Sequence, residues 1–139
     1  MSIRERVSPS VPFTLDVEDH TGKFSYSLRL AYNFRTLGLI EKHTGKSMLT
    51  EANEVFQNPT CDNVSILFWA ALQINHPEWR GEEGLSAVQN NLTLLTAKAV
   101  RNACEEAFVK QLPEEKIKQL AADKSDSAAP LEQSQETSA

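Results

Sequence analysis

One apolar run constrains the fold more than any other part of this 139-residue chain. It lies between Val64 and Leu72, reads VSILFWAAL, and carries apolar residues at i, i+3, i+4, i+7 and i+8, the spacing of a helix face directed at a core. Ile66, Trp69 and Ala70 extend the apolar character to the other side of the helix. Such a helix is either central in a core or part of an interface, so it requires covering elements or a partner.

Length and composition predict a single globular domain. The chain is 40% hydrophobic and 24% charged, with a formal net charge of -5. Its 14 Lys and Arg residues are dispersed, whereas a nucleic-acid surface needs them clustered, so we expect no nucleic-acid partner. No stretch of about eighteen apolar residues predicts a transmembrane helix, and the first ten residues lack the apolar segment of a secretory signal. We therefore expect a cytosolic protein without a membrane partner.

An N-terminal β-hairpin is predicted from alternation of apolar and polar residues. Residues 1–11 are polar and aperiodic, which indicates a flexible arm. Residues 12–19 alternate with period two, as do residues 24–30, and a short segment containing Gly22 separates them. An isolated hairpin is marginal in water, so helices must cover its apolar face.

Helical segments fill the rest of the predicted domain, residues 12–112. A first helix is expected over residues 31–43, ending at Gly45, and a short one over residues 47–56. Thr60 or Asp62 caps the apolar helix, which ends before Pro77. A turn of helix opening at Gly84 or Ser86 runs through Val88, and the longest helix covers residues 92–112. The residues expected to face inward are Phe34, Leu37 and Ile40 in the first helix, Leu49, Ala52, Val55 and Phe56 in the second, and Leu95, Ala99, Ala103, Ala107 and Phe108 in the last.

The predicted fold class is α+β and mostly α, with an N-terminal β-hairpin packed on a bundle of four to five helices. A short C-terminal helix is expected over residues 113–124, because proline at position 113 suits a first helical turn. Residues 125–139 are rich in Ser, Gln, Glu and Ala and are expected to be disordered.

No residue pattern indicates catalysis, a cofactor or a metal. Asp16, Glu18 and His20 are close in sequence, but they fall on the polar side and at the turn of the hairpin, where solvated charge is expected. None of the three histidines has a ligand-type partner at i+3 or i+4. Cys61 and Cys104 are expected to be reduced and partly buried. We predict a non-enzymatic protein.

The large aromatic residues are candidates for either core or interface positions. Phe68 and Trp69 belong to the apolar helix, and Trp79 follows it. Aromatic side chains dominate both core and interface energetics, so the sequence leaves open whether Trp69 fills the core or contacts a partner.

Three phrases of the chain carry a resemblance to a known family. They are LRLAYN at residues 28–33, EKHTG at residues 41–45 and LFWAAL at residues 67–72. With the order of hairpin and helices, the region from about Phe13 to Leu112 resembles the tail assembly chaperones of siphophages and gene transfer agents. The loop at residues 77–84 departs from that family's pattern in being longer and more charged.

The resemblance implies a bacteriophage virion-assembly protein of the host cytoplasm that acts through protein–protein interaction. Its expected partner is the tape measure protein, which it keeps soluble while helping to recruit tail tube subunits. The major tail tube protein and a second copy of the chain are further partners to consider. An acidic helical protein suits this role, because it can cover apolar helical faces and add solubilising charge. The expected partner-contacting residues are Phe68, Trp69, Leu72, Leu94, Leu95 and Phe108.

Other functions remain as alternatives. The chain is also compatible with a structural minor tail or connector protein of the virion, which would be found in purified particles. A small enzyme using Asp16, Glu18 and His20 is a second alternative, and a regulatory protein that binds one host target is a third.

Overall fold

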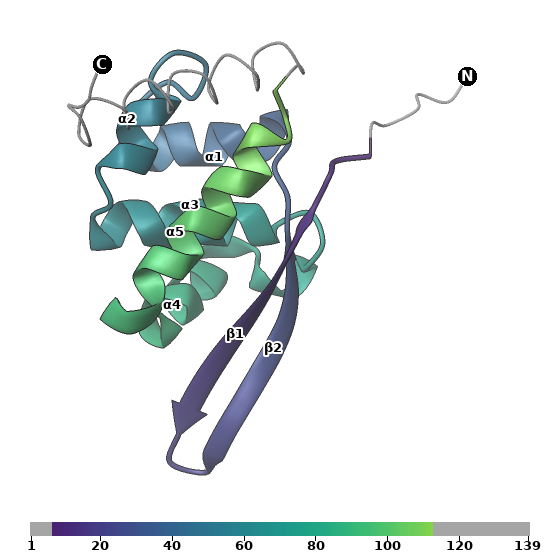
Figure 1. Cartoon of the computed structure of the whole chain (residues 1–139), viewed down its shortest axis with the longest axis vertical. Helices are drawn as coiled ribbons and strands as arrows, with labels where there is room; N and C mark the ends of the chain where they lie inside the picture. The colour runs from purple at the N-terminus through teal and green to yellow at the C-terminus, as the bar shows by residue number, and fades with distance from the viewer. Residues whose placement is uncertain (1–6, 113–139) are drawn as a thin grey trace, which may run out of the picture.

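The computed structural model describes residues 7–112 and has two strands followed by helices (Figure 1). The predicted fold class, α+β and mostly α with an N-terminal hairpin, is confirmed. The predicted helix at 113–124 and the predicted disordered tail at 125–139 lie outside the described residues. The elements are β1 (Val11–Asp19), β2 (Gly22–Leu30), α1 (Phe34–Thr44), α2 (Ala52–Gln57), α3 (Cys61–Leu72), the 3₁₀ turn η1 (Pro77–Trp79), α4 (Gly81–Asn91) and α5 (Leu94–Val109).

The hairpin is antiparallel and in register from Val11 opposite Leu30 to Asp19 opposite Gly22. The Asp19 carboxylate holds its turn, because Oδ1 accepts hydrogen bonds from the Thr21 backbone at 2.7 Å and the Gly22 backbone at 3.1 Å. The hydrogen bonds from Thr21 hold the pKa of this carboxyl below its usual value. Gly22 has φ 147°, a conformation that other residues rarely adopt.

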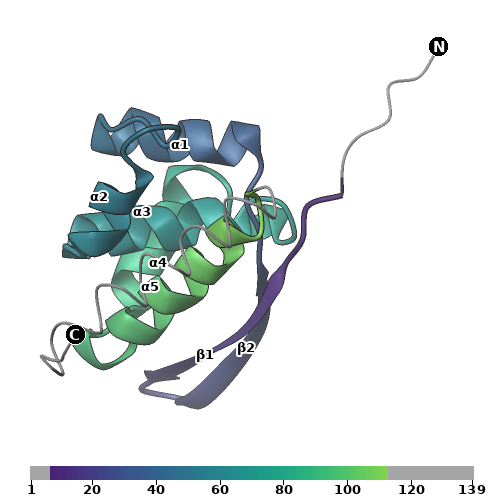
Figure 2. The ribbon, with the colours of Figure 1, turned by 45° about the horizontal axis from the view of Figure 1, so that its top comes forward.

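Helices cover only the open end of the hairpin. Leu28 and Leu30 are buried there, whereas Phe24 and Tyr26, on the same face of β2, are 48% and 43% exposed. The closed end of the hairpin projects past the helices (Figures 1 and 2). The strands are therefore longer than the helical surface that can cover them.

The apolar helix α3 is central in the fold. Every residue from Val64 to Leu72 is buried, and α3 contacts α1, α4, α5 and β2 (Figure 2). The end of β2 is tied to this helix, since the Ala31 backbone N–H donates to the Ala71 carbonyl at 3.0 Å. The Tyr32 hydroxyl donates to the Leu67 carbonyl at 2.7 Å. Of the two positions that the sequence allowed for this helix, the structure selects the core.

Side-chain caps set the starts of three helices. The Asn33 side chain accepts a hydrogen bond from the Thr36 backbone at 2.9 Å, and the Thr36 hydroxyl accepts one from the Asn33 backbone, so α1 begins after Asn33 rather than at Ala31 as predicted. Thr60 caps α3, which was one of the two predicted caps, and Thr93 caps α5. Gly45, with φ 73°, ends α1 in the left-handed conformation, as predicted.

Several predicted inward-facing residues are exposed. Phe34 lies about 120° around α1 from the buried Ile40, because six residues at about 100° each bring it to another face. Leu95 lies about 140° around α5 from Val100, which with Cys104 and Ala107 forms the buried face. Leu49 precedes α2 and is exposed in the turn before it. The prediction that these three residues face inward is wrong, and it is also wrong for Ala99, which is exposed on α5.

Candidate partner-binding groove

An apolar groove of about 830 Å³ lies between α1, α2 and the C-terminal end of α5. Apolar side chains make up most of its wall, and Phe34 and Leu49 stand at it with 79% and 72% of their surface exposed. Its lining residues are Ser8, Asn33, Phe34, Arg35, Leu37, Met48, Leu49, Thr50, Ala52, Asn53, Phe56, Glu105, Phe108, Val109, Gln111 and Leu112. We call this cavity the apolar groove.

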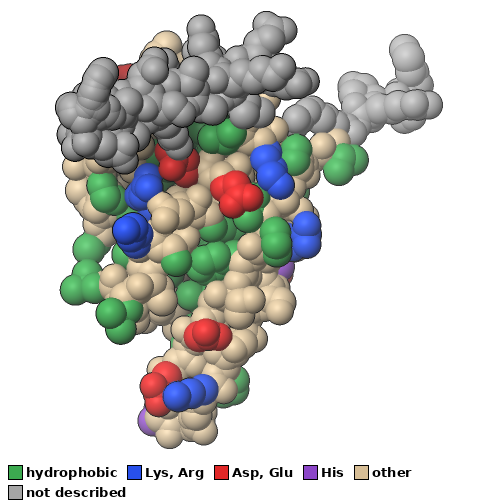
Figure 3. Space-filling view, in the orientation of Figure 1, with side chains coloured by type: hydrophobic (Ala, Val, Ile, Leu, Met, Phe, Trp, Pro, Cys, Tyr) green, Lys and Arg blue, Asp and Glu red, His purple; other side chains and the backbone are tan. Residues whose placement is uncertain are grey.

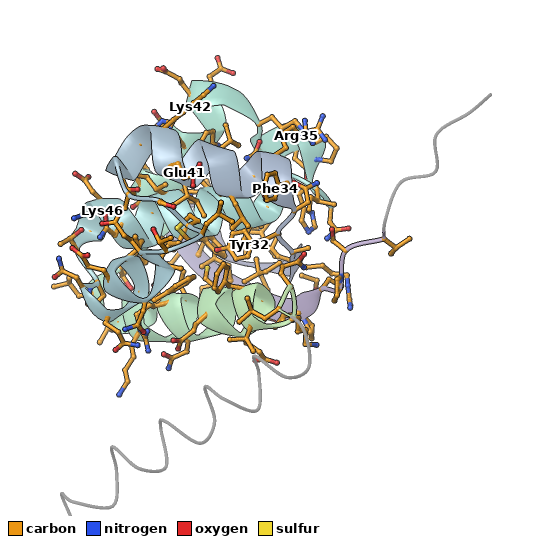
Figure 4. All side chains as sticks on the ribbon, turned by 90° about the horizontal axis from the view of Figure 1, so that it is seen from above. Tyr32, Phe34, Arg35, Glu41, Lys42 and Lys46 are labelled. Carbon is orange, nitrogen blue, oxygen red and sulfur yellow. The ribbon has the colours of Figure 1, made fainter. Side chains whose placement is uncertain are left out.

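The capped start of α1 positions one wall of the groove. The hydrogen bonds between Asn33 and Thr36 fix the first turn of α1, and Thr36 is fully buried there. Phe34 and Arg35, which lie at the start of this helix in Figure 4, are therefore directed away from the core. Local capping and burial of Thr36 thus place an exposed aromatic ring at the groove.

The turn between α1 and α2 positions the opposite wall. After Gly45 reverses the chain, the Met48 backbone donates to Glu41 Oε2 at 2.9 Å and the Ser47 backbone donates to Glu51 Oε1 at 3.1 Å. Met48 is buried by this arrangement, and its neighbour Leu49 is left exposed. The carboxylates of Glu41 and Glu51 therefore hold the turn that presents Leu49.

Aromatic residues connect the floor of the groove with the core. The rings of Phe56 and Phe108 are 5.4 Å apart between centroids, and Phe108 also packs edge-on against Tyr32 at 6.4 Å. Tyr32 is fully buried, in the middle of the fold in Figure 4. Arg101 Nη1 donates to the Phe56 carbonyl at 3.0 Å, which joins the end of α2 to α5. The floor is consequently continuous with the hydrophobic core, whereas Phe34 and Leu49 are exposed.

The chemistry of the groove suits binding rather than bond-making. Arg35 and Glu105 are the charged residues among its described lining, and they carry opposite signs. The lining contains no His or Cys, and its hydroxyl groups belong to Ser8 and Thr50. Apolar walls with few polar groups are typical of surfaces that accept apolar side chains of a partner.

The predicted contact residues of α3 are not at the surface. Phe68 and Leu72 are fully buried and Trp69 is 4% exposed, so a partner cannot reach them while the domain is folded. Trp69 Nε1 donates to the carbonyls of Trp79 at 2.9 Å and Gly81 at 3.1 Å. Because its ring and its N–H are both used inside the fold, Trp69 is a core residue, and the expectation that these three residues contact a partner is corrected.

The predicted contact residues of α5 separate into two places. Phe108 is half-buried and lines the apolar groove. Leu94 and Leu95 are 87% and 94% exposed at the other end of α5, where hydrophobic side chains appear at the edge of the molecule in Figure 3. The structure therefore brings one of the six predicted residues to the groove. The sequence analysis assigned Phe34 and Leu49 to the core. The pair Asn33 and Thr36 has the pattern of a helix cap, and this pattern could have shown that Phe34 lies in the first turn of α1.

The acidic residues of the hairpin do not form a catalytic arrangement. Asp16 Oδ1 accepts a hydrogen bond from the Ser25 hydroxyl across the strands at 2.6 Å, and Asp19 is used in the turn. Asp16, Glu18 and His20 are all exposed. In the described part of the chain, no three His, Cys, Asp or Glu side chains are grouped to hold a metal ion.

The two cysteines have opposite environments. Cys104 is fully buried beside Tyr32, and burial raises the pKa of its thiol to about 12. Cys61 is exposed at the first position of α3, so the prediction that both cysteines are partly buried is wrong for Cys61.

Maleimide labelling at pH 8 is expected to modify one thiol per folded chain. With a pKa of about 12, only about one Cys104 thiol in ten thousand is ionised at that pH, and the side chain is also inaccessible. Intact mass spectrometry should show a single adduct before unfolding and two adducts in urea. A Cys61→Ser variant is the control and should remain unlabelled while folded. Rapid labelling of that variant under native conditions would show that Cys104 is accessible.

None of the helices between residues 7 and 112 combines the length and the apolar character needed to cross a membrane. Comparison of the chain with protein-family models, with curated proteins and with solved structures gives no match.

Proposed function

We propose that this chain is a non-enzymatic tail assembly chaperone that holds an apolar segment of the tape measure protein in the apolar groove. It acts in the host cytoplasm, keeps this client soluble and helps to recruit tail tube subunits. The observation that carries the proposal is the pair of exposed residues Phe34 and Leu49 at the groove of an acidic protein with net charge -5.

Two further features support the proposal. The phrases at residues 28–33, 41–45 and 67–72 resemble tail assembly chaperones, and they form the end of β2, the end of α1 and the buried half of α3. Of the described lining residues of the groove, Asn33 belongs to one of these phrases, and two of the phrases contribute to the central packing. An amphipathic helix of a client, with apolar residues at i, i+3 and i+4, matches a groove of this kind.

Co-expression with the tape measure gene of the same phage or gene transfer agent tests this function. Phe34→Glu combined with Leu49→Glu should abolish retention of soluble client. Loss of an interface anchor costs about 2 kcal/mol or more, so the pair is expected to weaken binding by at least about 100-fold. Both side chains are largely exposed, so the fold should be retained, which circular dichroism checks.

Leu94→Glu combined with Leu95→Glu is the matched control. These two residues are also apolar and exposed, and the variant adds the same charge at a distance from the groove. Retention of client by this control and loss by the groove variant is the expected result. If both variants retain the client, the groove is not the binding site. If the wild-type chain neither binds nor solubilises the tape measure protein and instead occurs in purified particles, it is a structural tail or connector protein.

A further inference from the structure

The chain leaves the described fold at the edge of the apolar groove. Val109, at the end of α5, and Leu112, the last described residue, both line the groove. The sequence continues from this point with PEEKIKQLAADK at residues 113–124. The segment that follows therefore begins at the groove, which Phe108 and the exposed Leu49 also line.

The sequence of residues 113–124 has the pattern of a short helix with one apolar side. Pro113 suits a first helical turn, and Glu114 and Glu115 would place carboxylates at the positive end of the helix dipole. Ile117, Leu120 and Ala121 follow at i, i+3 and i+4. A helix of twelve residues is about 18 Å long.

The groove offers both apolar and charged partners to this segment. Phe34 and Leu49 expose most of their surface, and large exposed apolar groups are stabilised when another apolar surface covers them. Arg35, also on the lining, makes no ion pair within residues 7–112. The acidic pair at positions 114 and 115 supplies the opposite charge.

We propose that residues 113–124 occupy the apolar groove of their own chain, with Ile117 and Leu120 against it, and that a client displaces them. Covalent attachment favours occupancy of the groove, because a segment joined directly to its site has an effective concentration on the order of millimolar. A weak apolar contact is then sufficient to fill the groove, and an intermolecular ligand of higher affinity can still compete. Displacement by a client rests on the function proposed above, whereas occupancy by the segment does not.

Thiol accessibility in the full-length chain tests the occupancy. The reporter is Leu49→Cys in a Cys61→Ser background, in which Cys104 is buried. In this reporter, Ile117→Glu combined with Leu120→Glu should raise the maleimide labelling rate of position 49 by about threefold or more, because the charged segment leaves the groove.

Gln119→Glu combined with Ala122→Glu is the matched control, since it adds the same two carboxylates on the other side of the predicted helix. It should leave the labelling rate within about 1.5-fold of the reporter alone. Equal rates in the two double variants, whether raised or unchanged, would overturn the inference. Circular dichroism confirms that the variants being compared are folded.

A client assay separates this inference from the proposed function. If the segment competes with the client, Ile117→Glu combined with Leu120→Glu should also increase affinity for a tape measure fragment, and the control pair should not. A change in labelling rate without any client binding supports self-occupancy and removes the proposed function. Client binding at the groove with no change in labelling rate leaves the function in place and overturns self-occupancy.

Discussion

Gly84→Ala is expected to lower the free energy of unfolding by about 3 kcal/mol, although alanine is normally the better helix former. Gly84 is buried in α4, and a Cβ atom added there would overlap the carbonyl carbon and oxygen of Trp79 and lie 2.9 Å from its Cα. These are backbone atoms, so the clash is relieved only by moving η1 away from α4. The helix-propensity gain of about 1 kcal/mol is too small to offset that movement.

The same clash affects the hydrogen bonds made by the Trp79 carbonyl. This oxygen accepts from Trp69 Nε1 at 2.9 Å and from Gln73 Nε2 at 3.3 Å, and both donors are buried. Moving the carbonyl breaks both bonds, although Trp69 Nε1 keeps the Gly81 carbonyl at 3.1 Å and Gln73 Nε2 keeps the Trp69 carbonyl at 2.8 Å. The added cost is therefore that of the lost hydrogen bonds, about 0.5–1.5 kcal/mol for each.

Gly38→Ala is the matched control. Gly38 lies inside α1, and a Cβ atom there would meet nothing within 4 Å. This variant should raise the free energy of unfolding by about 0.5–1 kcal/mol. Urea denaturation followed by circular dichroism measures both changes. Similar stability of the two variants would mean that α4 and η1 are not packed as closely as described.

Trp69→Ala is expected to lower the free energy of unfolding by about 3–5 kcal/mol. The ring is 4% exposed, contacts His43 edge-on at 5.3 Å between centroids, and donates to two carbonyls. Truncation therefore removes a large buried surface and both hydrogen bonds. Since a small domain has a total stability of about 5–15 kcal/mol, the melting temperature should fall by about 15 °C or more.

Trp69→Phe separates packing from hydrogen bonding. It keeps an aromatic ring but removes the indole N–H, so it should be less destabilising than Trp69→Ala by about 2 kcal/mol. Thermal unfolding followed by circular dichroism gives the comparison. A Trp69→Ala protein that melts with the wild type would place this side chain outside the core. If a folded Trp69→Ala variant of unchanged stability no longer binds the client, Trp69 contacts the client.

Features that depend on nearby residues were predictable from the sequence. The alternation of residues 12–19 and 24–30 predicted the hairpin, and Gly45 and Thr60 marked a helix end and a helix start correctly. The start of α4 was missed, because Gly81 and the neighbouring charges suggested a loop. There, close packing of Gly84 on Trp79 favours a helix that composition disfavours.

The apolar groove was largely unpredictable. Of its lining, only Phe108 was a predicted contact residue, whereas Phe34 and Leu49 were assigned to the core and are exposed. Hydrophobicity alone does not distinguish an apolar side chain that is buried in a core from one that is exposed at a surface. The difference depends on which face each helix presents, and burial of Thr36 and Ile40 decides this for α1.

The sequence by itself determined the kinds of element, their order and the presence of one helix so apolar that the core or a partner must cover it. Short-range physics is enough for these features, since alternation, caps and glycine conformations act within a few residues. Only the tertiary structure decided that Trp69 is a core residue and that Phe34 and Leu49 border a groove. Those outcomes arise from contacts between residues far apart in the chain, where a rotation of about 100° per residue moves a side chain from the core to the surface.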